Sequence, residues 1–198
     1  MPVLKQTPSQ TIGPFFAYGL CPEQYNFELA SLFTPVLAER HAAGQPITIE
    51  GRVYDGSGKA VDDAVIEMLQ ADAAGQYAES LEGIAASGFK GFARVGTGTG
   101  TDAQSRFVVE TIKPGALGPA SAPHIDVIVM MRGMLLHAYT RIYFEEDAAA
   151  HAQDAVLAAV PPERRGTLIA RRLPYAGRNA YQFDIHLQGP HETVFFDV

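Results

Sequence analysis

The sequence predicts a mainly β protein: an antiparallel β-sandwich with an extended N-terminal arm and one short helical segment. At least seven segments have the composition of strands, and turn-forming residues separate them. Only one segment has the pattern of a helix. The first 46 residues are rich in proline, glycine and aromatic side chains and follow no regular period. We therefore expect an arm over residues 1–46 and a single sandwich domain over residues 47–198.

The arm contains the stretch TIGPFFAYGLCPEQYNFELASLFTP. Its prolines and the pair Phe15-Phe16 argue against a regular element. So many aromatic side chains do not suit a freely solvated segment. The arm is therefore expected to be ordered and to lie on its own domain or on a partner chain.

The first predicted strand, ITIEGRVYD, alternates strictly between two faces, and Ile47, Ile49, Gly51 and Val53 share one of them. The sequence DGSG then turns the chain. The other predicted strands are AVIEMLQA, RFVVETI, HIDVIVMM, LLHAYTRIYF, YQFDIHLQ and TVFFDV, with a short edge strand at GFARV inside the glycine-rich loop 83–100.

The helical segment is EDAAAHAQDAVLAAV, residues 146–160, which Pro161 and Pro162 bring to an end. The basic segment that follows, PPERRGTLIARRL, has no interleaved aromatic residues and is expected to be a solvated or partner-facing surface. The chain shows no internal repeat and no second domain.

Composition excludes several classes of function. The chain has 198 residues, 47% hydrophobic and 19% charged, which is typical of a globular protein. A net charge of −7 argues against a protein that binds nucleic acid or anionic lipid, because both ligands are negatively charged. No apolar run approaches the ~20 residues of a membrane span, and the N-terminus lacks a secretory signal. Cys21 is the only cysteine, so no disulfide can form within the chain. We expect a soluble, cytoplasmic protein.

The segment HIDVIVMM carries the strongest candidate for chemistry. His124 and Asp126 share the face opposite the apolar residues Ile125, Val127, Val129 and Met131. A His and a carboxylate so placed are two thirds of an iron(II) facial triad, and His186 on another alternating strand is the best candidate for the third ligand. Oxygenases of this kind that use 2-oxoglutarate carry a basic residue after the last His, but no Lys or Arg follows Arg178. The alternative is a pair of polar residues that face solvent or an interface.

Two further residues could carry chemistry. Tyr77 follows the turn ADAAGQ and could bind ferric iron as a phenolate, or it could pack, half-buried, at the end of the turn. Arg132, beside Gly133 between two strands, could clamp a carboxylate with its planar guanidinium, or it could be a surface residue of a hairpin. The sequence contains no G-x-S-x-G, P-loop, G-x-G-x-x-G or H-E-x-x-H motif.

Several segments, in this order, resemble the intradiol ring-cleaving dioxygenases. They are the segment from ITIEGRVYD to DAAGQY, FVVETIKPGA, APHIDVIVMMRGMLLHAYTRIYFEED and FDIHLQG, together with TPSQTIGPFF in the arm. Catalytic chains of that family hold ferric iron with two Tyr and two His. By the resemblance, Tyr77 and His124 match the first ligand of each pair, whereas Leu117 and Asp126 replace the second, and Ser121 replaces a catalytic Arg. The resemblance thus implies a vestigial site, with no bound metal and no catalytic residue in this chain.

The resemblance further implies the non-catalytic α member of an αβ hetero-oligomer whose β chain holds Fe(III). The α chain would bind the carboxylate of protocatechuate through Thr11, Gly13, Pro14 and Arg132, and its arm would pack on the β chain. The implied reaction uses O2 to cleave protocatechuate to 3-carboxy-cis,cis-muconate in the β-ketoadipate pathway of aromatic degradation.

Two alternatives remain open from the residues. One is an autonomous non-haem iron oxygenase that uses His124, Asp126 and His186. The other is a non-enzymatic β-sandwich binding module of transthyretin-like shape.

Overall fold

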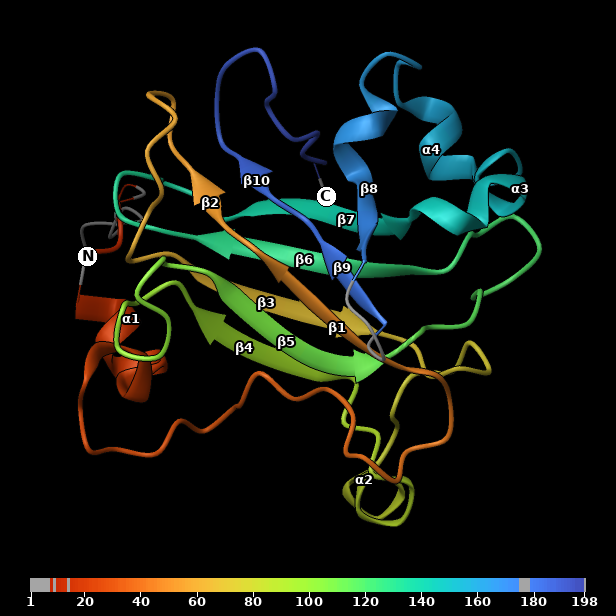
Figure 1. Ribbon diagram of the computed structural model, residues 1–198, viewed down its shortest axis with the longest axis horizontal. Helices are drawn as coiled ribbons and strands as arrows, with labels where there is room; N and C mark the ends of the chain where they lie inside the picture. The colour runs from red at the N-terminus through yellow and green to blue at the C-terminus, as the bar shows by residue number, and fades with distance from the viewer. Residues whose placement is uncertain (1–7, 9, 14, 175–178, 198) are drawn as a thin grey trace, which may run out of the picture.

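The computed structural model describes residues 8, 10–13, 15–174 and 179–197. The fold is built on one eight-stranded sheet that folds over on itself, and a two-stranded sheet lies beside it (Figure 1). The strands are β1 (Pro46–Gly51), β2 (Val53–Tyr54), β3 (Val65–Gln70), β4 (Phe92–Gly96), β5 (Phe107–Ile112), β6 (His124–Met130), β7 (Ala138–Phe144), β8 (Ile169–Leu173), β9 (Ala180–Gln182) and β10 (Ile185–His186). The α-helices are α1 (Phe15–Leu20), α2 (Leu81–Ser87), α3 (Ala148–His151) and α4 (Ala155–Ala159), and the 3-10 helices are η1 (Pro22–Tyr25), η2 (Glu145–Asp147) and η3 (Arg165–Leu168).

The large sheet has the strand order β4-β3-β6-β7-β8-β9-β1-β5. Its pairs are antiparallel except β7–β8 and β1–β9, and the small sheet pairs β2 with β10 in parallel. Strand β8 joins the half that contains β6 to the half that contains β1 (Figure 1). The two ends of the sheet, β4 and β5, lie side by side. The predicted mainly β sandwich is confirmed.

The core lies between the two halves of the sheet, and strand alternation fills it as predicted. Ile125, Val127 and Val129 of β6 are all fully buried, and so is Ile49 of β1. They pack with large side chains from the other strands, among them Phe107, Phe144 and Tyr181. The opposite face of β6 carries His124, Asp126, Ile128 and Met130.

Gly51 at the end of β1 is required by a close backbone approach. A Cβ atom at this position would lie 1.8 Å from the carbonyl oxygen of Phe183. We expect Gly51→Ala to lower the free energy of unfolding by about 2 kcal/mol or more, because the segment after β9 would have to move. Gly118→Ala is the matched control, since nothing lies within 4 Å of its Cβ position. Urea denaturation of both variants measures the difference, and equal midpoints would contradict it.

The arm is more regular than predicted. Helix α1 begins at Phe15, directly after Pro14 in the sequence, and a proline is well tolerated at the start of a helix. The helix and η1 bury Ala17 and Cys21 against Val65 of β3. This burial outweighs the weak helix propensity of the segment, so part of the arm packs on its own domain.

The structure differs from the sequence predictions at three other places. The basic segment contains β8, which pairs with two strands and buries Ala170, while Arg171 and Arg172 are exposed. In the described part of the segment TVFFDV, residues 193–197, Phe196 forms an isolated bridge with Tyr139 in place of a strand. Helix α2, with Ser80 as its N-cap residue, runs from Leu81 to Ser87 and so extends into the predicted glycine-rich loop.

The predicted helix over 146–160 is divided into η2, α3 and α4. The division falls at Asp154, whose side chain accepts a hydrogen bond from Leu157 N and caps α4. Asp154 also accepts hydrogen bonds from Ala122 N and from the Tyr143 hydroxyl, so these contacts fix α4 on the sheet. In the part of the chain that the structure describes, no helix is long and apolar enough to cross a membrane.

Candidate functional site

The sequence-predicted residues gather at opposite ends of β6. Strand β6 begins at His124, two residues before Asp126, on the side of α3, and it ends two residues before Arg132, on the side of α1 (Figure 1). The six steps from His124 to Met130 span about 20 Å in an extended strand. The two groups of residues therefore cannot belong to one small-molecule site within this chain. We call them the vestigial site (Tyr77, Leu117, His124 and Asp126) and the Arg132 site (Thr11, Asp63, Arg132 and Gly133).

Two loops bring Tyr77 and Leu117 to the start of β6. Gly115 N donates a hydrogen bond to the carbonyl oxygen of Asp72 at 2.7 Å. Gly75, with φ of +80°, approaches so closely that a Cβ atom would lie 2.1 Å from the carbonyl oxygen of Ala116. The turn before Tyr77 is thus in direct contact with the loop that carries Leu117.

One ring nitrogen of His124 is hydrogen-bonded to the backbone, and the other could bind a metal ion. The side chain is buried, and Nδ1 lies 2.8 Å from the carbonyl oxygen of Ala122. Because a carbonyl oxygen can only accept, Nδ1 carries the proton and Nε2 is the possible ligand atom. Nε2 lies 3.8 Å from Oδ1 of Asp126.

The carboxylate of Asp126 forms an ion pair with an arginine. Arg141 lies directly opposite it on β7, and its Nε donates to Oδ1 of Asp126 at 2.8 Å. Burial alone would lower the pKa of Arg141, but contacts with Tyr143 and Asp126 outweigh this and raise that pKa. The guanidinium therefore stays charged and holds the carboxylate that stands at a metal-ligand position.

The surroundings of Tyr77 raise the pKa of its hydroxyl and favour the neutral phenol. Burial raises the pKa of its hydroxyl, the negative charge of Asp126 raises that pKa further, and Arg141 only partly opposes them. The side chain is 40% exposed, as expected for a tyrosine at the end of a turn. Leu117 offers no donor atom. A ferric ion therefore does not fit the vestigial site.

The iron(II) triad suggested by His124, Asp126 and His186 is not formed. His186 lies on β10, where its ring stacks on Tyr54 at 4.9 Å between ring centroids. Among the described residues, no group of three or more His, Cys, Asp or Glu side chains is placed to hold a metal ion. The strand pattern predicted the orientation of each side chain but could not place β10 relative to β6.

At the other end of β6, the structure joins the arm to the segment after the strand. The backbone N–H of Gly133 donates to the hydroxyl of Thr11 at 2.7 Å, across 122 positions of sequence. Gly13 is exposed, with nothing within 4 Å of its Cβ position. Pro14 lies outside the described residues. Two of the predicted substrate-binding segments thus come together.

Arg132 is paired with a buried acid that the sequence did not single out. Its Nε lies 2.7 Å from Oδ2 of Asp63. Both side chains border a cavity of about 470 Å³, which the rings of Tyr18 and Phe27 also line. Asp62 is a second acid on its wall. The Arg132 site is therefore a polar hollow with an aromatic side.

Comparison with known proteins places this arrangement in a family. The family model described as "Dioxygenase" matches residues 31–189. The protocatechuate 3,4-dioxygenase alpha chain of Burkholderia cepacia is 59% identical over 199 residues, which cover all of both chains. The chain belongs to the protocatechuate 3,4-dioxygenase alpha chains. The resemblance to intradiol dioxygenases that the motifs indicated is confirmed.

Two further comparisons agree with this family. The protocatechuate 3,4-dioxygenase beta chain of Burkholderia cepacia is 31% identical over 160 residues, which cover 76% of this chain and 67% of the beta chain. The solved dioxygenase domain from Streptomyces sp. SirexAA-E has a TM-score of 0.62 at 24% identity and covers 96% of this chain and 100% of that domain. Because the chain belongs to a dioxygenase family and has its fold, the alternative of a non-enzymatic binding module is rejected.

Sequence reasoning missed two residues of this α chain. Arg141 could have been found, because pairing the two strands of the hairpin places it opposite Asp126. Asp63 gave no such signal, because it lies in a turn 69 positions before Arg132 and follows no strand or helix period.

Proposed function

We propose that this chain is the non-iron-binding α subunit of a protocatechuate 3,4-dioxygenase, and that a β chain holds the Fe(III) and the catalytic ligands. Together the two chains cleave protocatechuate with O2 to 3-carboxy-cis,cis-muconate, a step of aromatic degradation through the β-ketoadipate pathway. The α chain lines the substrate pocket and supports assembly, and it works in the cytoplasm, where its single free cysteine would stay reduced.

One observation carries this proposal: the separation of the two ends of β6. At the vestigial site, Leu117 has no donor atom, and the carboxylate of Asp126 is paired with Arg141. The Arg132 site is ordered by the hydrogen bond between Gly133 and Thr11, although no metal-ligand position lies near it. A substrate site without its own reaction centre is expected where a second chain completes it.

The chemistry of the Arg132 site suits the substrate. Protocatechuate carries a carboxylate that catechol lacks, and the Arg132 side chain is 58% exposed and charged. A guanidinium can bind a carboxylate through two parallel hydrogen bonds. Thr11, which accepts a hydrogen bond from the neighbouring Gly133, and Gly13 are both exposed. These residues, together with Pro14, bind and orient the substrate, and the β chain supplies the oxidative chemistry.

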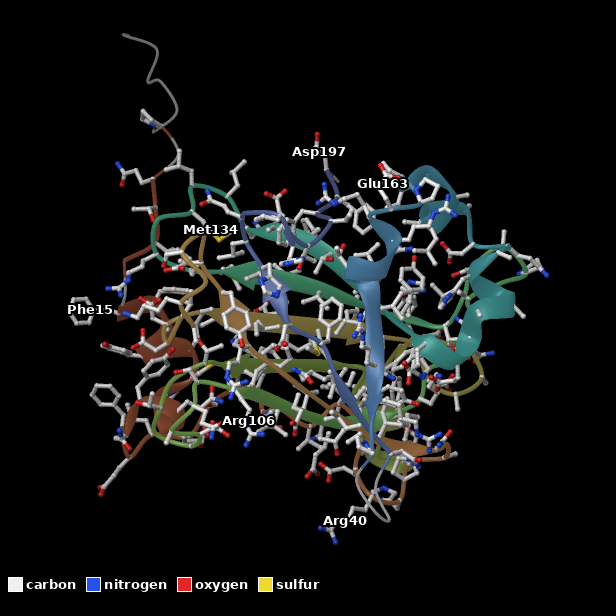
Figure 2. All side chains as sticks on the ribbon, turned by 45° about the horizontal axis from the view of Figure 1, so that its top comes forward. Phe15, Arg40, Arg106, Met134, Glu163 and Asp197 are labelled. Atoms are coloured by element: carbon white, nitrogen blue, oxygen red, sulfur yellow. The ribbon has the colours of Figure 1, made fainter. Side chains whose placement is uncertain are left out.

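Exposed apolar side chains support a partner at this end of the molecule. Phe15 of α1 is 76% exposed, and Leu135 and Leu136 after Arg132 are 61% and 71% exposed. Figure 2 shows Phe15 pointing away from the protein body, on the same side as Met134. The arm exposes Leu29 and Leu32 as well. Such patches are typical of protein interfaces, so we propose that residues 1–46 pack in part on the β chain.

Co-expression tests this function. The chain made alone is expected to contain no stoichiometric ferric iron and to show no phenolate-to-iron absorption or activity. Made with the β chain of the same organism, it is expected to form a complex with one iron per αβ pair and protocatechuate-dependent O2 uptake. Tyr77→Phe in the α chain is the control and leaves iron content and activity unchanged. One iron per isolated α chain, or no complex with the β chain, would reject the proposal.

A further inference from the structure

The pair between Asp63 and Arg132 is asymmetric. The Asp63 side chain is only 7% exposed, whereas that of Arg132 is 58% exposed. Among the described residues, no donor makes a well-aligned hydrogen bond with either carboxylate oxygen of Asp63. The contact at 2.7 Å is therefore an ion pair, and this buried carboxylate depends on a single cation.

The contact uses the inner side of the guanidinium. Asp63 meets Nε of Arg132, the nitrogen nearest the side-chain stem. The pair with Asp63 does not use the two terminal nitrogens, and these can form the parallel pair of hydrogen bonds that a carboxylate accepts. The backbone next to Arg132 is held as well, because Gly133 adopts φ of +89° and donates to Thr11. Asp63 thus holds the guanidinium, while the hydrogen bond to Thr11 holds the backbone beside it.

The stability of the fold does not explain why a buried acid is present at position 63. Burial raises the pKa of its carboxyl, and Asp62 adds to this, while Arg132 only partly opposes it. A carboxyl whose pKa is higher in the folded state stabilises the fold while it is protonated, and this contribution is lost as the pH rises through the folded pKa. Ionised Asp63 is therefore a cost to folding at neutral pH, and a neutral isostere is not expected to lower stability.

We propose that Asp63 is a positioning residue, which holds the guanidinium of Arg132 in the orientation that receives the substrate carboxylate. This inference rests on the proposed function. Without Asp63, the long Arg132 side chain would sample several rotamers, and part of its binding energy would be spent on ordering it. The effect belongs to binding and not to ring cleavage, so it separates KM from kcat.

The test is Asp63→Asn in the assembled αβ enzyme. We expect KM for protocatechuate to rise about 5- to 10-fold with kcat within about twofold, as for an interaction lost equally from the ground state and the transition state. In an Arg132→Ala background, Asp63→Asn is expected to change KM no further, because it acts through Arg132. Glu39→Gln is the matched control, because it removes an acid that pairs with Lys90 outside the Arg132 site, and it leaves KM unchanged. Thermal unfolding is expected to show a Tm no lower than that of the wild type.

The outcomes separate the two proposals. An unchanged KM in Asp63→Asn, while Arg132→Ala raises it, overturns the positioning role and leaves the proposed function intact. A lower KM also overturns it, since Asp63 would then compete with the substrate for Arg132. If Arg132→Ala leaves KM unchanged, Arg132 does not bind the carboxylate and both proposals for this site fail. Asp63→Ser provides the same readout should the Asn variant fail to assemble.

Discussion

Arg132→Ala in the assembled αβ enzyme is expected to lower kcat/KM for protocatechuate by about 10- to 150-fold, mainly through KM. The loss corresponds to about 1.5–3 kcal/mol, the usual contribution of a hydrogen bond to a charged group. The physical reason is the exposed guanidinium, which is the cation that the structure offers at the end of β6. Steady-state O2 uptake over a range of protocatechuate concentrations measures the effect.

Controls for Arg132→Ala separate substrate binding from assembly. Iron content per αβ pair is expected to stay unchanged, because the proposed iron ligands belong to the β chain and Arg132 is not one of them. Arg132→Lys is expected to fall between wild type and Ala, because an ammonium keeps the charge but loses the fork geometry. The variant also leaves buried Asp63 without its cation, so Asp63→Asn/Arg132→Ala is the control for stability. An unchanged KM in Arg132→Ala would remove Arg132 from the substrate pocket.

The sequence predicted the strands where alternation and burial coincide. β6 is the best example, since its three apolar side chains Ile125, Val127 and Val129 are all fully buried. β8 was missed because only Ala170 is buried in its centre, and the arginines on the strand made the segment resemble a surface. Its strand conformation comes from pairing with β7 and β9, which is a tertiary effect. Period alone cannot reveal such a strand.

The vestigial site and the Arg132 site differ in how much of each could be predicted from the sequence. Leu117 and Asp126 were found because motifs mark the ligand positions. The hydrogen bond between Thr11 and Gly133 joins segments 122 positions apart, and no local pattern encodes it. Asp63 depends on the same long-range packing. Local patterns therefore revealed what the vestigial site has lost, whereas only the fold shows what orders the Arg132 site.

Restoring the missing ligands of the vestigial site tests why it does not hold iron. We expect Leu117→Tyr/Asp126→His to bind no stoichiometric ferric iron, and the further change Arg141→Gln to allow one iron per chain with phenolate-to-iron absorption. Arg141 now pairs with Asp126 at 2.8 Å, and a neutral His would leave its guanidinium unpaired beside a triply charged ion. At about 4 Å, each unit of like charge costs on the order of 4 kcal/mol at an effective dielectric constant of about 20.

Iron analysis and visible absorption of the isolated chain measure this result. The matched control is Leu117→Phe/Asp126→His/Arg141→Gln, which has the same ring but lacks the second phenol oxygen. Loss of the Asp126–Arg141 pair itself is expected to cost little stability, because both side chains are 25–30% exposed and water screens the pair. If the double variant with Arg141 retained binds iron as tightly as the triple variant, the guanidinium is not the obstacle. Loss of metal binding would then rest on the missing donor atoms alone, and Arg141 would be a consequence of the lost ligands and not a cause of the lost binding.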